Sequence, residues 1–254
     1  MSLGKADSTM AVDELSVALN NSTIVASTPS SIAIQNNEVG KLLQRVQAVE
    51  SGIFQRNEAV DESTRRARRA VESLKCYSAQ WKWCPANYYN TELAQRAKHL
   101  GTFSQNQLCK AMLMENRAYD SKHARGKNDR TYSRFYLVVV QYTAEFNSRK
   151  LEVAIRSLRS MKEGRLTPNC FKFLVAKEED NLRLTGYAHN SVSPFGILDT
   201  TIPIVLPSAV VDELQSSSPI FWMGGGHVHL KLGMAINDFI RATNAIVADV
   251  TDPR

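Results

Sequence analysis

Lys110 stands out among the residues that could do chemistry, because it interrupts an apolar stretch of the sequence. Residues 108–114 read LCKAMLM, with apolar side chains on both sides of the lysine. Burying an ammonium group among such side chains is costly unless the lysine has a partner or a task. Its long stem could also carry the charge to solvent, so Lys110 is a candidate catalytic cation with a structural alternative.

Two glycine-containing segments are candidates for holding a ligand through their backbones. Residues 185–196 read TGYAHNSVSPFG, and this crowding of Gly, Asn, Ser and Pro predicts a loop between two strands with exposed N–H groups. Such a loop can hold a carbonyl oxygen or a phosphate, although a plain tight turn is an equal alternative. Residues 221–234 read FWMGGGHVHLKLGM, where the glycine triplet allows close approach to the backbone.

Two histidines follow the glycine triplet with the spacing of a strand. His227 and His229 would share one strand face, where they could bind a metal ion. No third ligand lies nearby in the sequence, which favours ordinary surface histidines and predicts no metal site.

Hydrophobic periodicity and turn residues predict a mixture of helices and strands around these segments. The expected helices cover residues 62–74, 91–100, 106–114, 150–160, 178–184, 208–215 and 236–243. The expected strands cover residues 135–142, 169–175, 202–206, 220–223, 228–232 and 246–250. This order indicates an α/β or mixed α+β fold in which part of the sheet is antiparallel.

The N-terminal part of the sequence differs in composition from the rest. Residues 1–35 are rich in Ser, Thr, Asn and Ala, which predicts a disordered tail. From residue 38 to 54, apolar residues recur at three- and four-residue steps, as in an amphipathic helix that could dimerise, bind a partner or pack on its own domain. We therefore expect a tail over 1–35, a helical extension over 36–63 and a compact domain over 64–254.

The charge of the chain favours polyanionic partners without naming one. The formal net charge is +6, and the sequence pI is about 9.2. Two basic segments could bind phosphates, a cluster at residues 65–69 and the polar segment 121–130. In segment 121–130, the candidate phosphate-binding residues are Arg125, Lys127 and Arg130.

Several functional classes lack support in the sequence. There is no G-x-S-x-G, Walker or H-E-x-x-H motif. No apolar run reaches the ~20 residues of a membrane span, and no signal peptide is visible, so we expect a cytoplasmic protein. The cysteines lie far apart without a C-x-x-C pair, which favours free thiols at Cys76, Cys84, Cys109 and Cys170.

The order of these motifs resembles the YbaK family of aminoacyl-tRNA deacylases, related to prolyl-tRNA synthetase. The resemblance rests on Lys110, then T-G-Y-x-x-x-x-V-S-P-x-G over 185–196, then the glycine triplet before a final strand, helix and strand. It covers residues 64–254. Segments 87–89 (NYY), 108–110 (LCK) and 186–190 (GYAHN) are similar to the longer, eukaryotic-type members.

The resemblance implies a mixed, partly antiparallel sheet flanked by helices, with a pocket for the 3′-terminal aminoacyl-adenosine of a mischarged tRNA. It implies an aminoacyl-tRNA hydrolase that needs no cofactor, with Lys110 as the catalytic residue. The loop amides would hold the ester carbonyl. The substrate-binding residues implied are Tyr187, His189, Asn190, Ser191, Val192, Ser193, Pro194, Gly196, Gly224, Gly225 and Gly226.

Two departures from the family pattern affect what can be carried over. Asn190 replaces the first glycine of the bacterial loop, and asparagine is the non-glycine residue most tolerant of a left-handed backbone. Lys231 stands where the family has an aspartate after the second glycine loop, so bacterial substrate preference does not transfer.

The resemblance suggests a small amino acid as the group removed, alanine first, from tRNA for proline, with cysteine and serine left open. A catalytically weak tRNA-binding or scaffolding subunit of a synthetase complex is the alternative. Residues 38–54 would then bind the complex, or a second copy of the chain. A small-molecule binding module is a third possibility.

Overall fold

The computed structural model describes residues 39–42, 58–216 and 220–254. The chain divides into two units, Met1–Gln55 and Arg56–Arg254. In the first unit, residues 39–42 are helical, and Val39 and Leu42 are exposed. The predicted tail and most of the predicted stripe over 38–54 lie outside the described residues.

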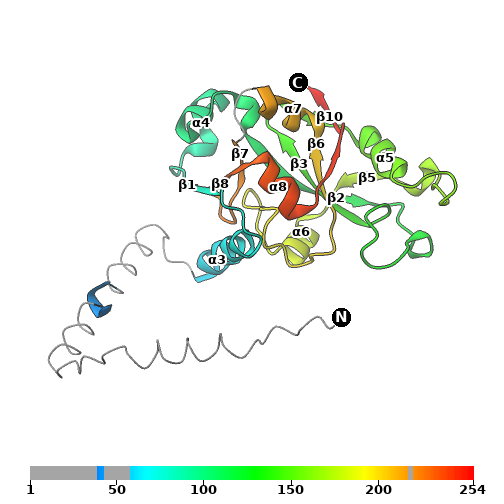
Figure 1. Cartoon of the computed structure of the whole chain (residues 1–254), viewed down its shortest axis with the longest axis horizontal. Coiled ribbons are helices and arrows are strands. Elements are labelled where there is room, and N and C mark those ends of the chain that lie inside the picture. The colour runs from blue at the N-terminus through cyan, green and yellow to red at the C-terminus, as the bar shows by residue number, and fades with distance from the viewer. Residues whose placement is uncertain (1–38, 43–57, 217–219) are drawn as a thin grey trace, which may run out of the picture. The chain divides into compact units, whose positions relative to one another are not determined.

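The second unit has the mixed α+β structure that the sequence predicts (Figure 1). Its α-helices are α3 (Glu58–Ser73), α4 (Leu93–Leu100), α5 (Ser148–Ser157), α6 (Glu178–Thr185), α7 (Ser208–Ser216) and α8 (Ile236–Thr243). Short 3-10 helices occur at η1 (Tyr88–Asn90), η2 (Gln105–Gln107), η3 (Ser121–His123) and η4 (Pro168–Cys170). All of α3 belongs to this unit, including the part before residue 64.

The strands form a central sheet and two smaller ones. They are β1 (Gln80–Trp83), β2 (Cys109–Asn116), β3 (Phe135–Gln141), β4 (Ala144–Phe146), β5 (Phe173–Val175), β6 (Ile204–Pro207), β7 (Ile220–Gly224), β8 (Leu230–Ala235), β9 (Ile246–Ala248) and β10 (Thr251–Pro253). The five-stranded sheet has the order β5-β2-β3-β6-β9, antiparallel at β5-β2-β3 and parallel at β3-β6-β9. The antiparallel sheets are β1-β8-β7 and β10-β4.

Strand β3 lies at the centre of the core because it is covered on both faces. Its sequence, FYLVVVQ, is buried throughout, as expected for an interior strand. Leu137 and Val139 face the larger apolar core, which includes side chains of β7, β8 and α8. Tyr136, Val138 and Val140 face the opposite way, toward the core that includes α5.

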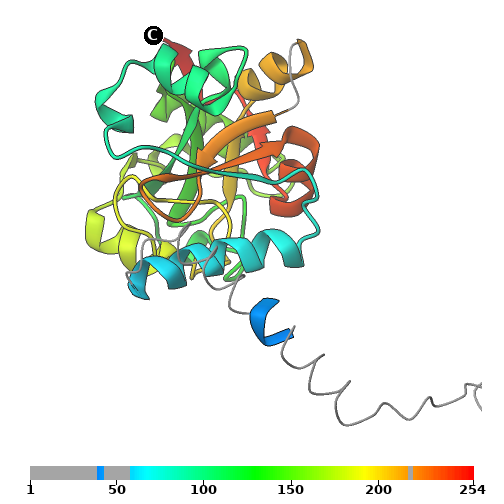
Figure 2. The same cartoon turned by 90° about the vertical axis from the view of Figure 1, so that its left-hand side faces the viewer.

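The small sheet β1-β8-β7 meets the central sheet at the start of β2. Trp222 on β7 pairs in parallel with Leu108, the residue just before β2. Figure 2 views the molecule from this side, where β1, β7 and β8 lie in front of the central strands. This junction brings the beginning of β2 close to the hairpin that contains the glycine triplet.

Several local predictions differ from the structure, and tertiary pairing explains the largest error. Residues 109–116 form β2 rather than part of a helix over 106–114, because β2 pairs with both β3 and β5 and this overrides the helix propensity of Leu, Lys, Ala and Met. Strands β1, β4 and β10 were not predicted, and the strand predicted over 169–175 is confined to β5, because its first residues belong to η4. Residues 185–196 connect helix α6 to strand β6 rather than two strands, and His227 and His229 lie in the turn before β8 rather than on a strand.

Candidate active site

One cavity collects residues from β2, β7, β8, η1 and the loop after α6. Its volume is about 370 Å³, within the usual range for a small-molecule site. The residues singled out in the sequence that line it include Lys110, His189, Asn190, Val192, Gly224 and Lys231. The structure thus brings the three chemistry-bearing segments to one place.

Lys110 presents a half-buried ammonium group to this cavity. It lies at the start of β2, opposite Val140 of β3, and its Nζ is 5.9 Å from the centre of the Tyr142 ring. Within the described part of the chain, this ammonium forms no hydrogen bond or ion pair. Burial, and then the charge of Arg254, lower the pKa of Lys110 from its ordinary value. Its donor hydrogens are therefore available to a ligand.

A second lysine, Lys231, reaches the same cavity from β8. Its exposed fraction is only 5%. Its Nζ donates to the hydroxyl of Tyr89 at 2.5 Å and to the carbonyl oxygen of Val228 at 3.2 Å. It also lies 4.6 Å and 5.3 Å from the ring centres of Tyr89 and Tyr88. Burial is the main reason why the pKa of Lys231 falls to about 8.

The sequence showed Lys231 only as a departure from a family pattern, not as a member of the site. One signal could have found it: in LKLGMA, the lysine occupies a strand position whose neighbours are apolar, as Lys110 does in LCKAMLM. Which face of the strand it occupies depends on its pairing with β1 and β7.

Aromatic side chains form the wall around the two lysines. Tyr88, Tyr89, Tyr142 and Trp222 line the cavity, and the guanidinium of Arg96 lies 5.5 to 5.8 Å from the three tyrosine ring centres. Burial raises the pKa of Tyr88 and of Tyr89, so both hydroxyls remain protonated at neutral pH. Aromatic faces of this kind suit a stacked nucleobase.

In the loop after α6, the backbone at Asn190 has a left-handed conformation. Asn190 has a φ of 62°, in the left-handed region that favours glycine and that asparagine tolerates better than other residues. The N–H groups of Asn190 and Val192 donate no hydrogen bond within the described residues. Because both residues line the cavity, these N–H groups are candidates for binding a ligand oxygen.

The two glycine-containing segments touch each other directly beside the cavity. A Cβ atom on Gly224 would lie 2.1 Å from the carbonyl oxygen of Val192, so a side chain does not fit there. The N–H of Gly226 donates to the carbonyl oxygen of Ser191 at 3.1 Å. The hydroxyl of Ser63 on α3 donates to the carbonyl oxygen of Gly226 at 2.9 Å. Gly224 therefore permits the close packing that forms this side of the cavity.

Other residues implied as substrate-binding do not line the cavity, and several of them make contacts that hold the loop. They are Tyr187, Ser191, Ser193, Pro194, Gly196, Gly225 and Gly226. The hydroxyl of Tyr187 donates to Phe195 O at 2.6 Å. From the basic cluster on α3, Arg66 donates to Gly196 O at 2.6 Å and to Gly186 O at 2.8 Å. Arg66 thus fixes both ends of the loop.

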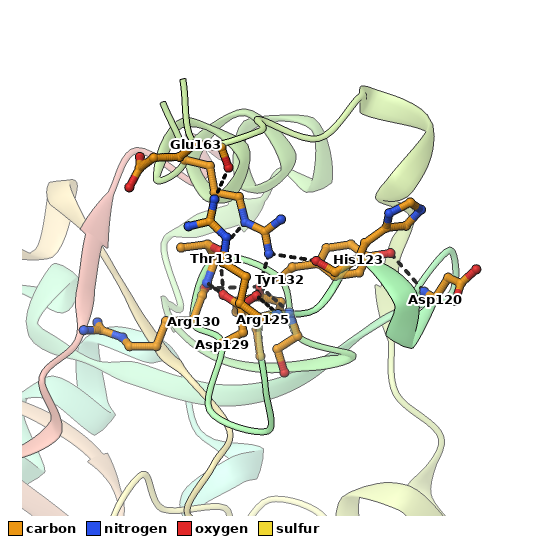
Figure 3. Close-up of polar contacts among 11 residues, drawn as sticks. Asp120, His123, Arg125, Asp129, Arg130, Thr131, Tyr132 and Glu163 are labelled. Atoms are coloured by element: carbon orange, nitrogen blue, oxygen red, sulfur yellow. Dashed lines mark hydrogen bonds and ion pairs between the residues drawn. The ribbon is translucent and has the colours of Figure 1, made fainter. Parts of the chain in front are cut away.

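The basic segment 121–130 lies on a surface loop whose residues do not line the Lys110 cavity. Figure 3 shows that a network of polar contacts holds this loop. Asp129 and Arg159 form an ion pair of 2.5 Å in which each side chain is only 5% exposed. Arg125 donates to Glu163 O, and Arg130 donates to Asn244 O. Lys127 is exposed on the same loop.

The histidine pair and the cysteines offer no metal site. His227 and His229 are half-buried, with their ring centres 5.5 Å apart. Across 39–42, 58–216 and 220–254, no group of three metal-binding side chains comes together. Cys76, Cys84, Cys109 and Cys170 are free thiols. Among the same residues, no helix is both long and apolar enough to cross a membrane.

Solved structures with a similar fold cover most of this chain. A candidate trans-editing enzyme for prolyl-tRNA synthetase is 18% identical with a TM-score of 0.56, over 75% of this chain and 97% of that one. A protein from computational epitope grafting onto scaffolds is 19% identical with a TM-score of 0.55, over 76% of this chain and 98% of that one. The hypothetical protein APE2540 is 18% identical with a TM-score of 0.51, over 74% and 99%.

The sequence itself gives no comparable match. No protein-family model matches it, and no curated protein is significantly similar to it. Structural likeness at this level of identity establishes the fold and leaves the activity to be argued from the site. The chain has a YbaK-like, mixed α+β fold.

Proposed function

We propose that this protein is a trans-acting aminoacyl-tRNA deacylase that hydrolyses the ester of mischarged tRNA. The observation that carries the proposal is the convergence of Lys110, the Asn190–Val192 backbone and Gly224 on one cavity. The fold it shares with a candidate trans-editing enzyme for prolyl-tRNA synthetase supports the same class of reaction. Aromatic residues lining the cavity offer surfaces for the terminal adenine.

The proposed chemistry needs no strong side-chain base, because an aminoacyl ester is already activated. Water attacks the ester carbonyl carbon, and a neighbouring ribose hydroxyl of the substrate relays the proton: it accepts a proton from the water and passes its own proton to the esterified ribose oxygen. The bond between the carbonyl carbon and that ribose oxygen breaks as the oxygen takes up the proton, which releases the amino acid and leaves a free ribose hydroxyl. The Lys110 ammonium and the N–H groups of Asn190 and Val192 stabilise the oxyanion that forms between these steps.

The proposed substrate carries a small amino acid, with alanine on tRNA for proline as the first choice. Serine and cysteine are the next candidates, because a pocket discriminates a single methylene by only about 1 to 3 kcal/mol. Loop 121–130 is proposed to add contacts to the tRNA phosphates through Arg125, Lys127 and Arg130.

The decisive assay measures release of labelled amino acid from a panel of mischarged tRNAs, led by alanyl-tRNA for proline. Lys110→Ala should lose about 100- to 1,000-fold in rate, which is the usual effect of removing one oxyanion donor. Lys172→Ala, which removes an exposed lysine that does not line the cavity, is the matched control. Equal rates for Lys110→Ala and the wild type on every substrate would exclude Lys110 as the catalytic residue.

Inactivity of the wild type on the whole panel would favour the alternative, a tRNA-binding or scaffolding subunit of a synthetase complex. Deleting Met1–Gln55 separates the two functions, since the cut leaves α3 and its contact with Gly226 intact. An autonomous deacylase should keep its rate after this deletion. A scaffolding subunit should lose its protein partners.

A further inference from the structure

We propose that Lys231 binds an anionic oxygen of the ligand that occupies the cavity. The proposal rests on the function above for the identity of the ligand, the aminoacyl end of a tRNA. It concerns binding only, so it is tested separately from hydrolysis.

Within the described residues, Lys231 has two hydrogen-bond acceptors and the rings of Tyr88 and Tyr89 as partners, which leave one donor hydrogen without an acceptor. A lysine ammonium has three donor hydrogens, and the described residues supply two acceptors, Tyr89 Oη and Val228 O. Within the part of the chain that the structure describes, Lys231 forms no ion pair with a carboxylate. Buried charges in proteins are normally paired. A ligand oxygen would supply the missing partner from the cavity side.

The remaining charges around the cavity point to the same kind of ligand. Lys110 lines it as a second cation, which has no hydrogen-bond or ion-pair partner among the described residues. Glu178 is the carboxylate residue in the lining, and it is mostly exposed, with its Oε2 atom 3.9 Å from His189 Nδ1. A ligand that brings only an ammonium group would be repelled by the two lysines, whereas carboxylate or phosphate oxygens would be attracted.

Two parts of an aminoacyl-tRNA could supply the anionic oxygen. One is the carboxylate of an acidic amino-acid side chain, in which case Lys231 selects the amino acid. The other is a phosphate of the terminal nucleotides, in which case Lys231 positions the tRNA end for any amino acid. Both place an oxygen on the third donor hydrogen of the same ammonium.

The test uses four hydrolysis-resistant ligands, in which an amide replaces the ester. They are 3′-alanylamino- and 3′-aspartylamino-3′-deoxyadenosine, each with and without a 5′-phosphate, titrated calorimetrically. Lys231→Met removes the charge and keeps the length of the side chain. Lys82→Met is the matched control, because Lys82 pairs with Lys231 across β1 and β8 and does not line the cavity.

Lys231→Met should weaken binding of the ligands that carry the relevant anion by about tenfold or more, as expected for a charge-assisted hydrogen bond. Loss confined to the aspartyl pair identifies the side chain as the source, and loss confined to the phosphorylated pair identifies the phosphate. Lys82→Met should bind all four ligands like the wild type. Lys231→Met should also melt no lower than the wild type, because it removes an unpaired buried charge.

Equal affinity of wild type and Lys231→Met for every ligand, or no binding to the wild type, would overturn the proposal. The proposed function fails differently. If Lys231 governs binding while no aminoacyl ester is hydrolysed, the cavity is a binding site and the deacylase assignment is wrong.

Discussion

The ammonium of Lys231 and the hydroxyl of Tyr89 are 2.5 Å apart, and the same hydroxyl donates to the carbonyl oxygen of Asn190 at 3.1 Å. This chain of hydrogen bonds joins β8, η1 and the loop after α6. It connects the buried cation of the cavity to the residue whose left-handed backbone shapes the loop.

Replacing Tyr89 by Phe should therefore disturb the cavity while the fold persists. We expect the free energy of unfolding to fall by about 2 to 4 kcal/mol, because the change removes two hydrogen bonds, one of which satisfies the buried ammonium of Lys231. The value of kcat/KM on the preferred aminoacyl-tRNA should fall about tenfold, since small errors in positioning are costly in catalysis. Tyr119→Phe, which changes a tyrosine stacked on Tyr132 outside the cavity, should retain full activity. Unchanged kinetics in Tyr89→Phe would show that the link is not needed.

The effect of Lys231 on the free energy of unfolding should depend on pH in one defined window. Burial lowers its folded-state pKa to about 8, below the value of about 10.4 in an unfolded chain. Between these values the unfolded state binds more protons, so the stability of the wild type rises with pH relative to Lys231→Met. The full change is about 3 kcal/mol, at about 1.4 kcal/mol per pKa unit. Below pH 8 the cost of burying the charged lysine is constant.

Denaturant unfolding of both proteins at pH 7, 8, 9 and 10 measures this difference. Lys231→Met should be the more stable protein at pH 7, and its advantage should shrink steadily above pH 8. An advantage that is the same at all four pH values would mean that Lys231 does not titrate in this window.

Gly224 should tolerate no side chain, because of its contact with Val192. A Cβ atom 2.1 Å from the carbonyl oxygen must push the two loops apart. Gly224→Ala should cost about 1 to 3 kcal/mol of stability, the range for overpacking, and should also impair the cavity. Gly40→Ala is the control, since a Cβ atom there meets nothing within 4 Å. Thermal melting and the deacylation rate together report the two effects, and wild-type values for both would contradict the loop contact.

The buried ion pair between Asp129 and Arg159 should govern the stability of the basic loop. Removing one partner, as in Asp129→Ala, leaves a buried charge and should cost about 3 to 5 kcal/mol. The double variant Asp129→Ala/Arg159→Met should recover part of this loss. Lys122→Met, which breaks an exposed 3.9 Å pair with Asp120, should cost at most about 1 kcal/mol. Equal losses for Asp129→Ala and Lys122→Met would contradict the different burial of the two pairs.

Lys127 provides a test of tRNA contact by this loop. Lys127→Ala should weaken tRNA binding to a similar extent for every tRNA sequence. It should also reduce, by about 1, the slope of the logarithm of the binding constant against the logarithm of the salt concentration. Lys172→Ala should leave affinity and slope unchanged. Identical slopes for Lys127→Ala and the wild type would place the tRNA elsewhere.

Local sequence signals were sufficient for many elements of the fold. The period and end signals of residues 236–243 coincide with α8, and the apolar run FYLVVVQ predicted β3 within one residue. Such segments carry their information in neighbouring residues, because amphipathic periods and turn residues act locally. Residues 109–116 were predicted wrongly for the converse reason, since their strand conformation depends on pairing with β3 and β5.

The candidate site could likewise be predicted from the sequence only in part, and the tertiary structure decided the rest. The sequence by itself determined that Lys110, the 185–196 loop and the glycine triplet are unusual. A lysine among apolar residues is costly to bury, and clustered Gly, Asn, Ser and Pro residues indicate a loop, wherever these segments lie in the fold. Only the tertiary structure decided that Lys110 and Lys231 line one cavity, and that Tyr187 and Gly196 support the loop instead. The physical reason is that strand pairing selects the face on which each side chain points, and this pairing joins segments far apart in the chain.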